Sequence, residues 1–276
     1  MKKSLIVGIN NYPGNKGMAL KGCLNDVARM TMYSLSRHQF SDTKILTDSK
    51  ATVQNVTKEL TELVSGSEAG DEILFYYSGH GSVIPDLSGD EEDMFDECLV
   101  LYDHHPDNAF TDDKLAQCIK GLHPEAYLTI ILDSCHGPGS LESEMLDKSA
   151  KDFDFPEGVS MDTNNTRKFG QRPGDPSMQR HVLFAACGEG GIGLEAPVGG
   201  RRKRNSKTFG VFTTMLVRTL RLNRYRHQSW RKISRSVVAK VLRFTEGGQV
   251  PVISGSADML DRHVFNPGIT ISEESE

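Results

Sequence analysis

Two segments of the sequence end an apolar run in a cluster of polar residues, and the two clusters carry complementary chemical groups. Residues 76–81 present the imidazole of His80 between two glycines, and residues 131–137 present the thiol of Cys135. A cysteine nucleophile needs an imidazole that either holds the sulfur as thiolate or accepts its proton. Flanking glycines let the backbone approach a ligand closely. The two segments therefore predict nucleophilic catalysis by Cys135 with His80 as its base.

Another interpretation of these residues stays open. His80 and Cys135 could be unrelated strand-end residues, which is the ordinary meaning of a single histidine and a single cysteine. His136 adjoins Cys135, but consecutive side chains diverge at a strand end, so His80 is the better base.

Both clusters follow apolar runs that are typical of buried strands in a parallel sheet, at residues 73–77 and 127–132. If the two strands are neighbours, His80 and Cys135 lie side by side at the carboxyl edge of the sheet, where open α/β sheets place their sites. Strands alternate with helices along the chain, which predicts a mostly parallel α/β sheet. The other expected strands are 5–9, 44–47, 98–101, 181–187 and 250–254. The expected helices are 20–35, 53–64 (capped by Thr52), 112–119 (capped by Thr111 or Asp112), 212–220 and 230–242.

Three segments have the composition of loops. Residues 82–95 are acidic, residues 137–179 are rich in glycine and proline, and residues 188–207 are glycine-rich and then basic. A structureless stretch as long as 137–179 is either functional or a linker. The GxGxxG pattern at 188–193 does not open a helix, so it favours a substrate-site loop over a dinucleotide site. The basic run 201–204 is typical of a solvated loop, although such runs also mark nucleic-acid or localisation patches.

The bulk composition is that of a soluble globular protein. The 276 residues are 37% hydrophobic and 25% charged, and the net charge of −5 gives no general attraction to nucleic acid or membrane. The five scattered cysteines include no CxxC pair, which argues against a disulfide framework and a structural zinc site. No apolar run reaches the length of a signal segment or of the ~20 residues of a membrane span. We therefore expect a cytoplasmic protein.

The motifs resemble those of a known family. Residues 77–81 and 133–137 resemble the two active-site motifs of the metacaspases, the caspase-like cysteine peptidases of bacteria, plants, fungi and protists. Residues 20–26 are similar to the family's Gly-Cys-x-Asn-Asp segment, and residues 89–97 are similar to its acidic loop. The resemblance covers nearly the whole chain and departs from the pattern at 137–139, where Gly-Pro-Gly replaces the usual Ser-Gly.

The resemblance implies a fold and a division of the chain. The fold is the three-layer, caspase-haemoglobinase-like α/β fold, whose mostly parallel six-stranded sheet is flanked by helices. A p20-like catalytic part at 1–136 and a p10-like part at 180–266 would share one compact domain, joined by a loop-rich linker at 137–179 and followed by an acidic tail at 267–276. The expected subclass is a bacterial-type metacaspase without a prodomain, and the expected oligomeric state is a monomer.

The resemblance also implies an activity. It predicts a cysteine endopeptidase that cleaves protein or peptide substrates after Arg or Lys through the Cys135–His80 dyad. The backbone N–H groups of Gly81 and Cys135 would form the oxyanion hole. A basic P1 side chain needs partly buried carboxylates, although Asp26 could merely cap a helix and Asp133 could merely bond a loop. The substrate-binding residues implied by the family are Cys23, Asp26, Ser78 and Asp133.

Calcium is the one cofactor that the resemblance implies, as an activator, and no organic cofactor is expected. Several hard oxygen ligands suit Ca²⁺, but adjacent acids at 112–113 also favour a helix N-terminus. Self-processing after a basic residue in 137–180 or 199–208 is expected as well. The calcium ligands implied by the family are Asp96, Asp112, Asp113 and Glu142.

Two other functions stay open. The chain could be a catalytically silent regulatory or scaffold module of the same fold, although the intact His80 and Cys135 argue against this. It could also be a caspase-clan peptidase with a different P1 preference.

Overall fold

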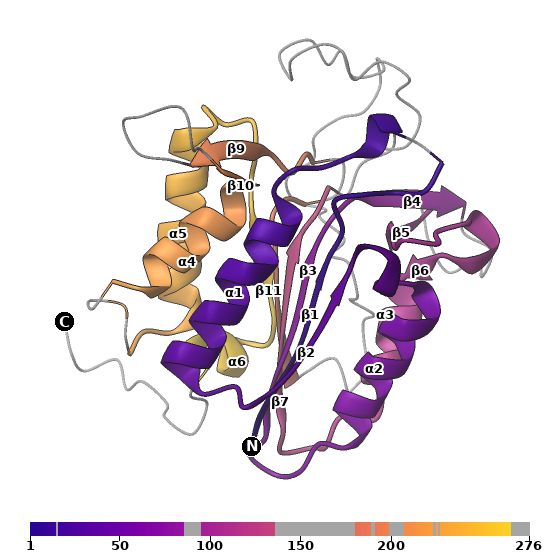
Figure 1. Cartoon of the computed structure of the whole chain (residues 1–276). Helices are drawn as coiled ribbons and strands as arrows, with labels where there is room; N and C mark the ends of the chain where they lie inside the picture. Colours follow the sequence, from indigo (N-terminus) through magenta and orange to yellow (C-terminus); the bar gives the residue numbers. More distant parts are fainter. Residues whose placement is uncertain are drawn as a thin grey trace.

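One sheet of six strands runs through the computed structural model of the chain, which describes residues 1–14, 16–85, 95–135, 180–188, 191–198, 207–222, 225 and 227–265. Its strands are β1 (Lys2–Gly8), β2 (Asp42–Thr47), β3 (Glu72–Ser78), β7 (Tyr127–Asp133), β8 (His181–Ala185) and β11 (Val252–Ser254). Their order is β11-β8-β7-β3-β1-β2, and only β11 runs antiparallel to its neighbour (Figure 1). The predicted α/β class and mostly parallel six-stranded sheet are confirmed.

Helices cover both faces of the sheet and complete three layers (Figure 1). Strand β3 alternates between the two faces, because successive side chains in a strand point in opposite directions. Phe75 and Tyr77 pack toward one face, and Leu74 and Tyr76 toward the other. The first face is covered by α2 (Val53–Ser65) and α3 (Asp112–Ile119), and the second by α1 (Cys23–His38), α4 (Val211–Leu220), α5 (Trp230–Phe244) and the short α6 (Ala257–Asp261).

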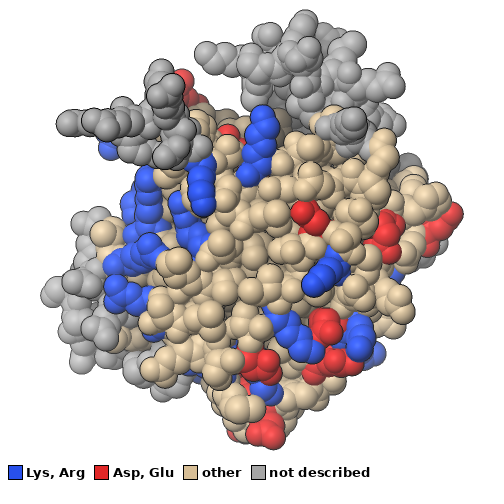
Figure 2. Space-filling view, in the orientation of Figure 1, with Lys and Arg blue, Asp and Glu red and all other residues tan. Residues whose placement is uncertain are grey.

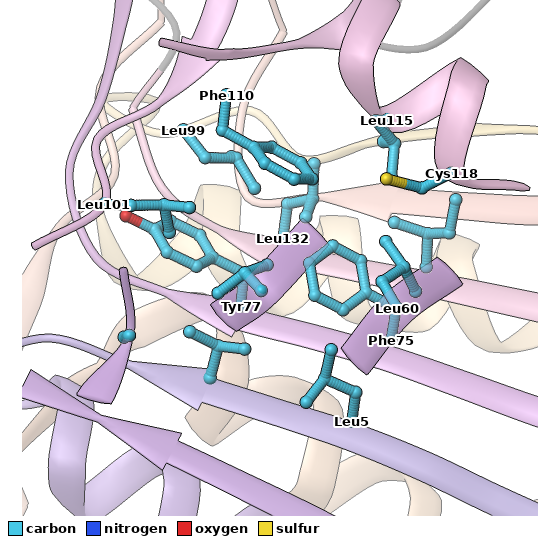
Figure 3. Packing of buried hydrophobic residues seen from close by; sticks show 14 of the residues in the cluster. Leu5, Leu60, Phe75, Tyr77, Leu99, Leu101, Phe110, Leu115, Cys118 and Leu132 are labelled. Carbon is cyan, nitrogen blue, oxygen red and sulfur yellow. The ribbon is translucent and has the colours of Figure 1, made fainter. Parts of the chain in front are cut away.

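The core under α2 and α3 fixes the sheet that carries the two motifs. Figure 3 shows Phe75, Tyr77 and Leu132 packed with Leu60 of α2 and Leu115 of α3. All five side chains are fully buried. Each such side chain contributes roughly 2 kcal/mol of hydrophobic stabilisation. The carboxyl ends of β3 and β7 are therefore held in register by packing as well as by strand pairing.

The predicted helix caps are present. The Thr52 side chain accepts a hydrogen bond from the Asn55 N–H, and α2 ends at Gly66. The Thr111 side chain accepts from the Lys114 N–H and starts α3. A side-chain oxygen at the cap satisfies an N–H group that has no partner within the helix.

Two of the predicted loops contain strands, so those predictions are partly wrong. The segment predicted as a loop at 82–95 enters a small antiparallel sheet, and the segment at 188–207 enters a hairpin. In both cases a short strand pairs with one that lies beyond an intervening stretch of the chain, so neighbouring residues do not reveal the pairing. The strands are β4 (Gly81–Pro85), β5 (Phe95–Leu99) and β6 (Phe110–Thr111) in the sheet, and β9 (Glu195–Val198) and β10 (Lys207–Gly210) in the hairpin.

Charge is spread unevenly over the surface. Figure 2 shows Lys and Arg side chains gathered over the α1 and α4 side of the molecule, while Asp and Glu lie mainly on the opposite side of this view. In the ranges that the structure describes, no helix has both the length and the apolar character needed to cross a membrane. The predicted linker 137–179, the basic run 201–204 and the tail 267–276 lie outside the described residues.

Candidate active site

The two motifs lie at adjoining strand ends. Strands β3 and β7 are parallel neighbours whose register places Ser78 opposite Asp133. The Gly79 N–H donates to the Asp133 carbonyl at 3.2 Å just beyond this pair. His80 therefore follows one strand by two residues, and Cys135 follows its neighbour by two. The prediction that these strands are adjacent is confirmed, and the imidazole and thiol leave the same edge of the sheet.

Cys135 is the accessible cysteine of the chain. Of the five cysteines, all of which the structure describes, Cys135 is half-buried and the other four are buried. The Gly193 N–H donates to the Cys135 sulfur at 3.0 Å. Burial raises the pKa of the Cys135 thiol, the hydrogen bond from Gly193 acts against this, and the charges of Asp133 and Glu195 raise it further. The resting group is therefore a protonated thiol.

His80 is held as a neutral imidazole with a defined tautomer. Its Nε2 lies 2.8 Å from the Met18 carbonyl oxygen. A carbonyl can only accept, so Nε2 carries the proton and Nδ1 is left as the acceptor. Burial lowers the pKa of His80, while the Met18 carbonyl and the charge of Glu195 act in the opposite direction. Within the described ranges no hydrogen bond joins His80 to Cys135, which is common before substrate binds.

Two buried carboxylates lie at the N-terminus of α4. The Gly210 N–H donates to Asp26 Oδ2 at 2.7 Å, and the Thr213 N–H donates to Asp133 Oδ2 at 3.0 Å. Asp26 thus bonds the start of α4, whereas α1, its own helix, has no side-chain cap. The second oxygen of Asp26, Oδ1, is buried and has no hydrogen-bond partner among the residues that the structure describes.

Glu195 brings a third carboxylate to the same place. It lies on β9 and accepts from the N–H groups of Lys21 and Gly22, at 3.1 and 2.7 Å, at the start of α1. The thiol of Cys23 also lies 3.7 Å from Glu195 Oε1. Sequence reasoning missed Glu195, because it lies 60 positions after Cys135 in a segment with loop composition. No local signal marks it, since only the pairing of β9 with β10 brings it here.

The negative charges of Asp26, Asp133 and Glu195 repel one another. Burial raises the pKa of Asp133 to about 6, and the charge of Glu195 adds to the rise. Burial and the charge of Asp133 raise the pKa of Asp26, and Arg29 lowers it. Three mutually repelling acids favour a bound cation, because a positive charge stabilises all of their ionised forms.

The structure brings the four expected substrate-binding residues together. Cys23 and Ser78 are both buried; burial raises the pKa of the Cys23 thiol, and the nearby Ser78 hydroxyl lowers it by less. The charges of Asp26 and Asp133 act on the same thiol. Residues from α1, β3 and β7 thus line one acidic site beside Cys135.

The expected calcium ligands are only partly gathered. Asp96 on β5 and Asp112 at the start of α3 are both buried. Burial raises the pKa of the nearby Cys98 thiol to about 12, and the charges of Asp96, Glu97 and Asp112 add to the rise. In the described ranges no group of three or more His, Cys, Asp or Glu side chains is arranged to hold a metal ion. The described residues alone therefore do not make a calcium site, and Glu142 lies outside them.

Solved structures share this architecture. A crystal structure of a Geobacter sulfurreducens protein superposes with a TM-score of 0.64 at 20% identity, covering 96% of this chain and 98% of that one. Caspase-1 from Spodoptera frugiperda superposes with a TM-score of 0.56 at 14% identity, covering 96% and 89%. At such low identities the likeness concerns the fold alone, and it confirms the predicted caspase-like fold.

Relatives are found in sequence as well. Metacaspase-4 of Arabidopsis thaliana is 37% identical over 173 residues, which cover 58% of this chain and 40% of that protein. Metacaspase-1 of Emericella nidulans is 38% identical over 150 residues, covering 51% and 37%. The chain therefore spans about two fifths of the length of these relatives. The family model described as "Metacaspase, peptidase C14 domain" matches residues 2–144, which are 143 of the 276 residues, and the chain belongs to the metacaspase family.

Proposed function

We propose that the protein is a cysteine endopeptidase that cleaves polypeptides after Arg or Lys. The observation that carries this proposal is the buried, unpartnered Oδ1 of Asp26 beside Asp133 and Glu195, near the reactive thiol. A buried carboxylate oxygen without a donor carries a large desolvation cost. A guanidinium or ammonium group at P1 supplies both the donor and the opposite charge. Family membership supports the cysteine-peptidase chemistry, and the acids support the basic specificity.

The first half of the reaction transfers the acyl group to sulfur. The Cys135 thiol gives its proton to Nδ1 of His80 as the sulfur attacks the scissile carbonyl carbon. The carbonyl electron pair moves onto oxygen, where the backbone N–H groups of Gly81 and Cys135 are the proposed donors. When the intermediate collapses, the C–N bond breaks and the imidazolium returns the proton to the leaving amine.

The second half restores the enzyme. His80 removes a proton from water as the oxygen attacks the thioester carbon, and the C–S bond then breaks. The imidazolium reprotonates the departing sulfur, so no proton or electron is left over. Because the neutral thiol and neutral imidazole are the resting forms, proton transfer accompanies attack. His80 therefore acts as a general base.

The test is a set of fluorogenic peptides that differ only at P1, carrying Arg, Lys, Gln or Asp. We expect cleavage of the Arg and Lys peptides, little cleavage of the Gln peptide and none of the Asp peptide, and we expect Cys135→Ala to be inactive. Cleavage of the Asp peptide in preference to Arg would refute the pocket. Activity in Cys135→Ala would refute the mechanism. If the wild-type protein cleaves none of the peptides and is not labelled by an Arg-based thiol-reactive inhibitor, the chain is a catalytically silent module.

Calcium activation and self-processing are further parts of the proposal. The buried pair Asp96 and Asp112 supports a cation near β5 and α3, and the site needs a further ligand from elsewhere. Calorimetric titration of the Cys135→Ala protein with Ca²⁺, compared with Asp96→Asn and Asp112→Asn, tests the site without any turnover. Mass spectrometry of wild-type protein incubated with Ca²⁺ tests self-cleavage after Arg or Lys.

A further inference from the structure

We propose that Tyr12 and Tyr77 are positioning residues for His80, which fix its backbone so that the imidazole meets the thiol in the productive orientation. This inference rests on the proposed function, in which His80 is the base. Neither tyrosine is among the residues that sequence reasoning assigned to the site.

The two tyrosines form hydrogen bonds with the main-chain N–H and C=O groups of His80. The His80 N–H donates to the Tyr12 hydroxyl at 2.8 Å. The Tyr77 hydroxyl lies 2.7 Å from the His80 carbonyl oxygen and 2.8 Å from the Val100 carbonyl oxygen, and its one proton is shared between these two acceptors. The two phenol groups also raise or lower each other's pKa, which places them close together. The N–H and the C=O of His80 are thereby tied to one small network.

The network explains why a tyrosine stands three residues before His80 and a glycine directly before it. Tyr77 lies three residues before His80 on the face of β3 that packs against α2 and α3, so its hydroxyl turns back onto the chain beyond the strand end. A Cβ at Gly79 would overlap the Tyr77 hydroxyl and lie 2.8 Å from the Tyr12 hydroxyl. Glycine is therefore required at position 79 to make room for the two phenols. The sequence had suggested that this glycine serves a ligand.

One loop contacts both the main chain and the imidazole of His80. Tyr12 and Met18 lie in the connection between β1 and α1, and the Met18 carbonyl accepts from Nε2 while Tyr12 accepts from the main-chain N–H. The Tyr12 ring also lies against the imidazole, with 5.0 Å between the ring centroids. The start of the loop is anchored by Asp48, which accepts from the Asn10 and Asn11 N–H groups at 2.8 and 3.0 Å. Main chain and side chain of His80 are thus oriented by the same element.

The network fits a positioning role better than general packing. A rotation of the His80 main chain would move the ring nitrogens, and a misplacement of about 1 Å can lower a rate roughly 100-fold. Both tyrosines are buried, and burial raises the pKa of each phenol, so neither exchanges protons near neutral pH. They act through His80, whose pKa is raised by the charge of Glu195 against the larger effect of burial.

The experiment compares wild type with Tyr12→Phe, Tyr77→Phe, the double variant and His80→Ala, in the full chain. Two readouts are used: kcat and KM for the Arg-P1 peptide, and the rate of Cys135 alkylation by iodoacetamide from pH 5 to 9, followed by peptide mass spectrometry. Tyr33→Phe is the matched control, because Tyr33 is also buried and its hydroxyl lies 2.7 Å from His38 Nε2, away from the site. Thermal unfolding of each variant monitors folding.

We expect kcat to fall about tenfold in each single variant and about 100-fold in the double variant, with KM within about twofold, because general-base efficiency depends on alignment. Alkylation near neutral pH should slow in the same order, toward the His80→Ala rate, and Tyr33→Phe should match wild type. Folded Tyr12→Phe and Tyr77→Phe proteins with wild-type kcat and alkylation would overturn the positioning role. If His80→Ala itself alkylates like wild type, the proposed dyad fails instead, so the two failures are distinguishable.

Discussion

Asp133→Asn is expected to make the protein more stable and the peptidase weaker. The substitution removes a charge from a buried carboxylate but keeps an oxygen that can accept from the Thr213 N–H. In the folded chain the pKa of Asp133 is raised from 3.8 to about 6, chiefly by burial. Folding therefore favours the protonated acid, and the ionised acid destabilises the folded state.

The magnitude follows from the size of the pKa rise. A rise of about 2 pKa units corresponds to roughly 3 kcal/mol, at about 1.4 kcal/mol per unit. Because the folded pKa lies above the unfolded one, this penalty is fully present above about pH 6. It disappears as the pH falls below the unfolded pKa of 3.8. Asp133→Asn should thus gain roughly 3 kcal/mol at pH 8 and only about 0.5 kcal/mol at pH 4.

Urea unfolding of both proteins at pH 4, 6 and 8 measures this difference. Asp103→Asn is the matched control, since Asp103 also accepts from a helix N-terminus, the Val53 N–H at 2.7 Å. Loss of that favourable helix–charge interaction should destabilise the control by about 0.5 kcal/mol at pH 8. The same Asp133→Asn protein should cleave the Arg-P1 peptide roughly 10- to 100-fold less efficiently, the worth of a charge-assisted hydrogen bond.

Two results would refute the reasoning. If Asp133→Asn is less stable than wild type at pH 8, the carboxylate is not carrying a burial penalty. If the variant is more stable but cleaves the Arg-P1 peptide as efficiently as wild type, the buried carboxylate of Asp133 destabilises the fold but does not bind the P1 side chain.

Two more predictions concern buried groups near the sheet. His181 is buried, its ring nitrogens have no hydrogen-bond partner in the described part of the chain, and burial lowers its pKa to about 4. The free energy of unfolding should therefore fall by roughly 3 kcal/mol as the pH drops from 6.5 to 4. In His181→Phe, urea unfolding should show a smaller dependence of this free energy on pH. An unchanged pH dependence would contradict the prediction. Gly210→Ala places a Cβ that overlaps Asp133 Oδ2. Thermal unfolding should therefore show a loss of stability of about 1–3 kcal/mol, and the variant should cleave the Arg-P1 peptide more weakly. A fully active, equally stable variant would contradict this by showing that α4 can shift freely.

The placement of His80 and Cys135 at one edge of the sheet was predictable because its signal is local. His80 and Cys135 each follow a continuous apolar run, and a parallel sheet brings such strand ends to one edge. Thr52 and Thr111 were predictable as helix caps for the same reason, since a cap acts within three residues of itself. Glu195 was not predictable, because it lies on a hairpin strand whose partner is separated by residues of loop composition.

The sequence by itself therefore determined the sheet, its helices, the placement of His80 and Cys135 at one sheet edge, and the family, through apolar periodicity and short motifs. Tertiary structure alone decided how the acids are used: α4 begins against Asp26 and Asp133, and β9 brings Glu195 to the start of α1. It also decided that the tyrosine and glycine before His80 hold its backbone. The physical reason is sequence separation. Strand and helix patterns act over a few residues, whereas the contacts of Tyr12, Asp133, Glu195 and Asp26 described above join groups 68 to 184 positions apart, and the short Tyr77–His80 contact leaves no pattern in the sequence.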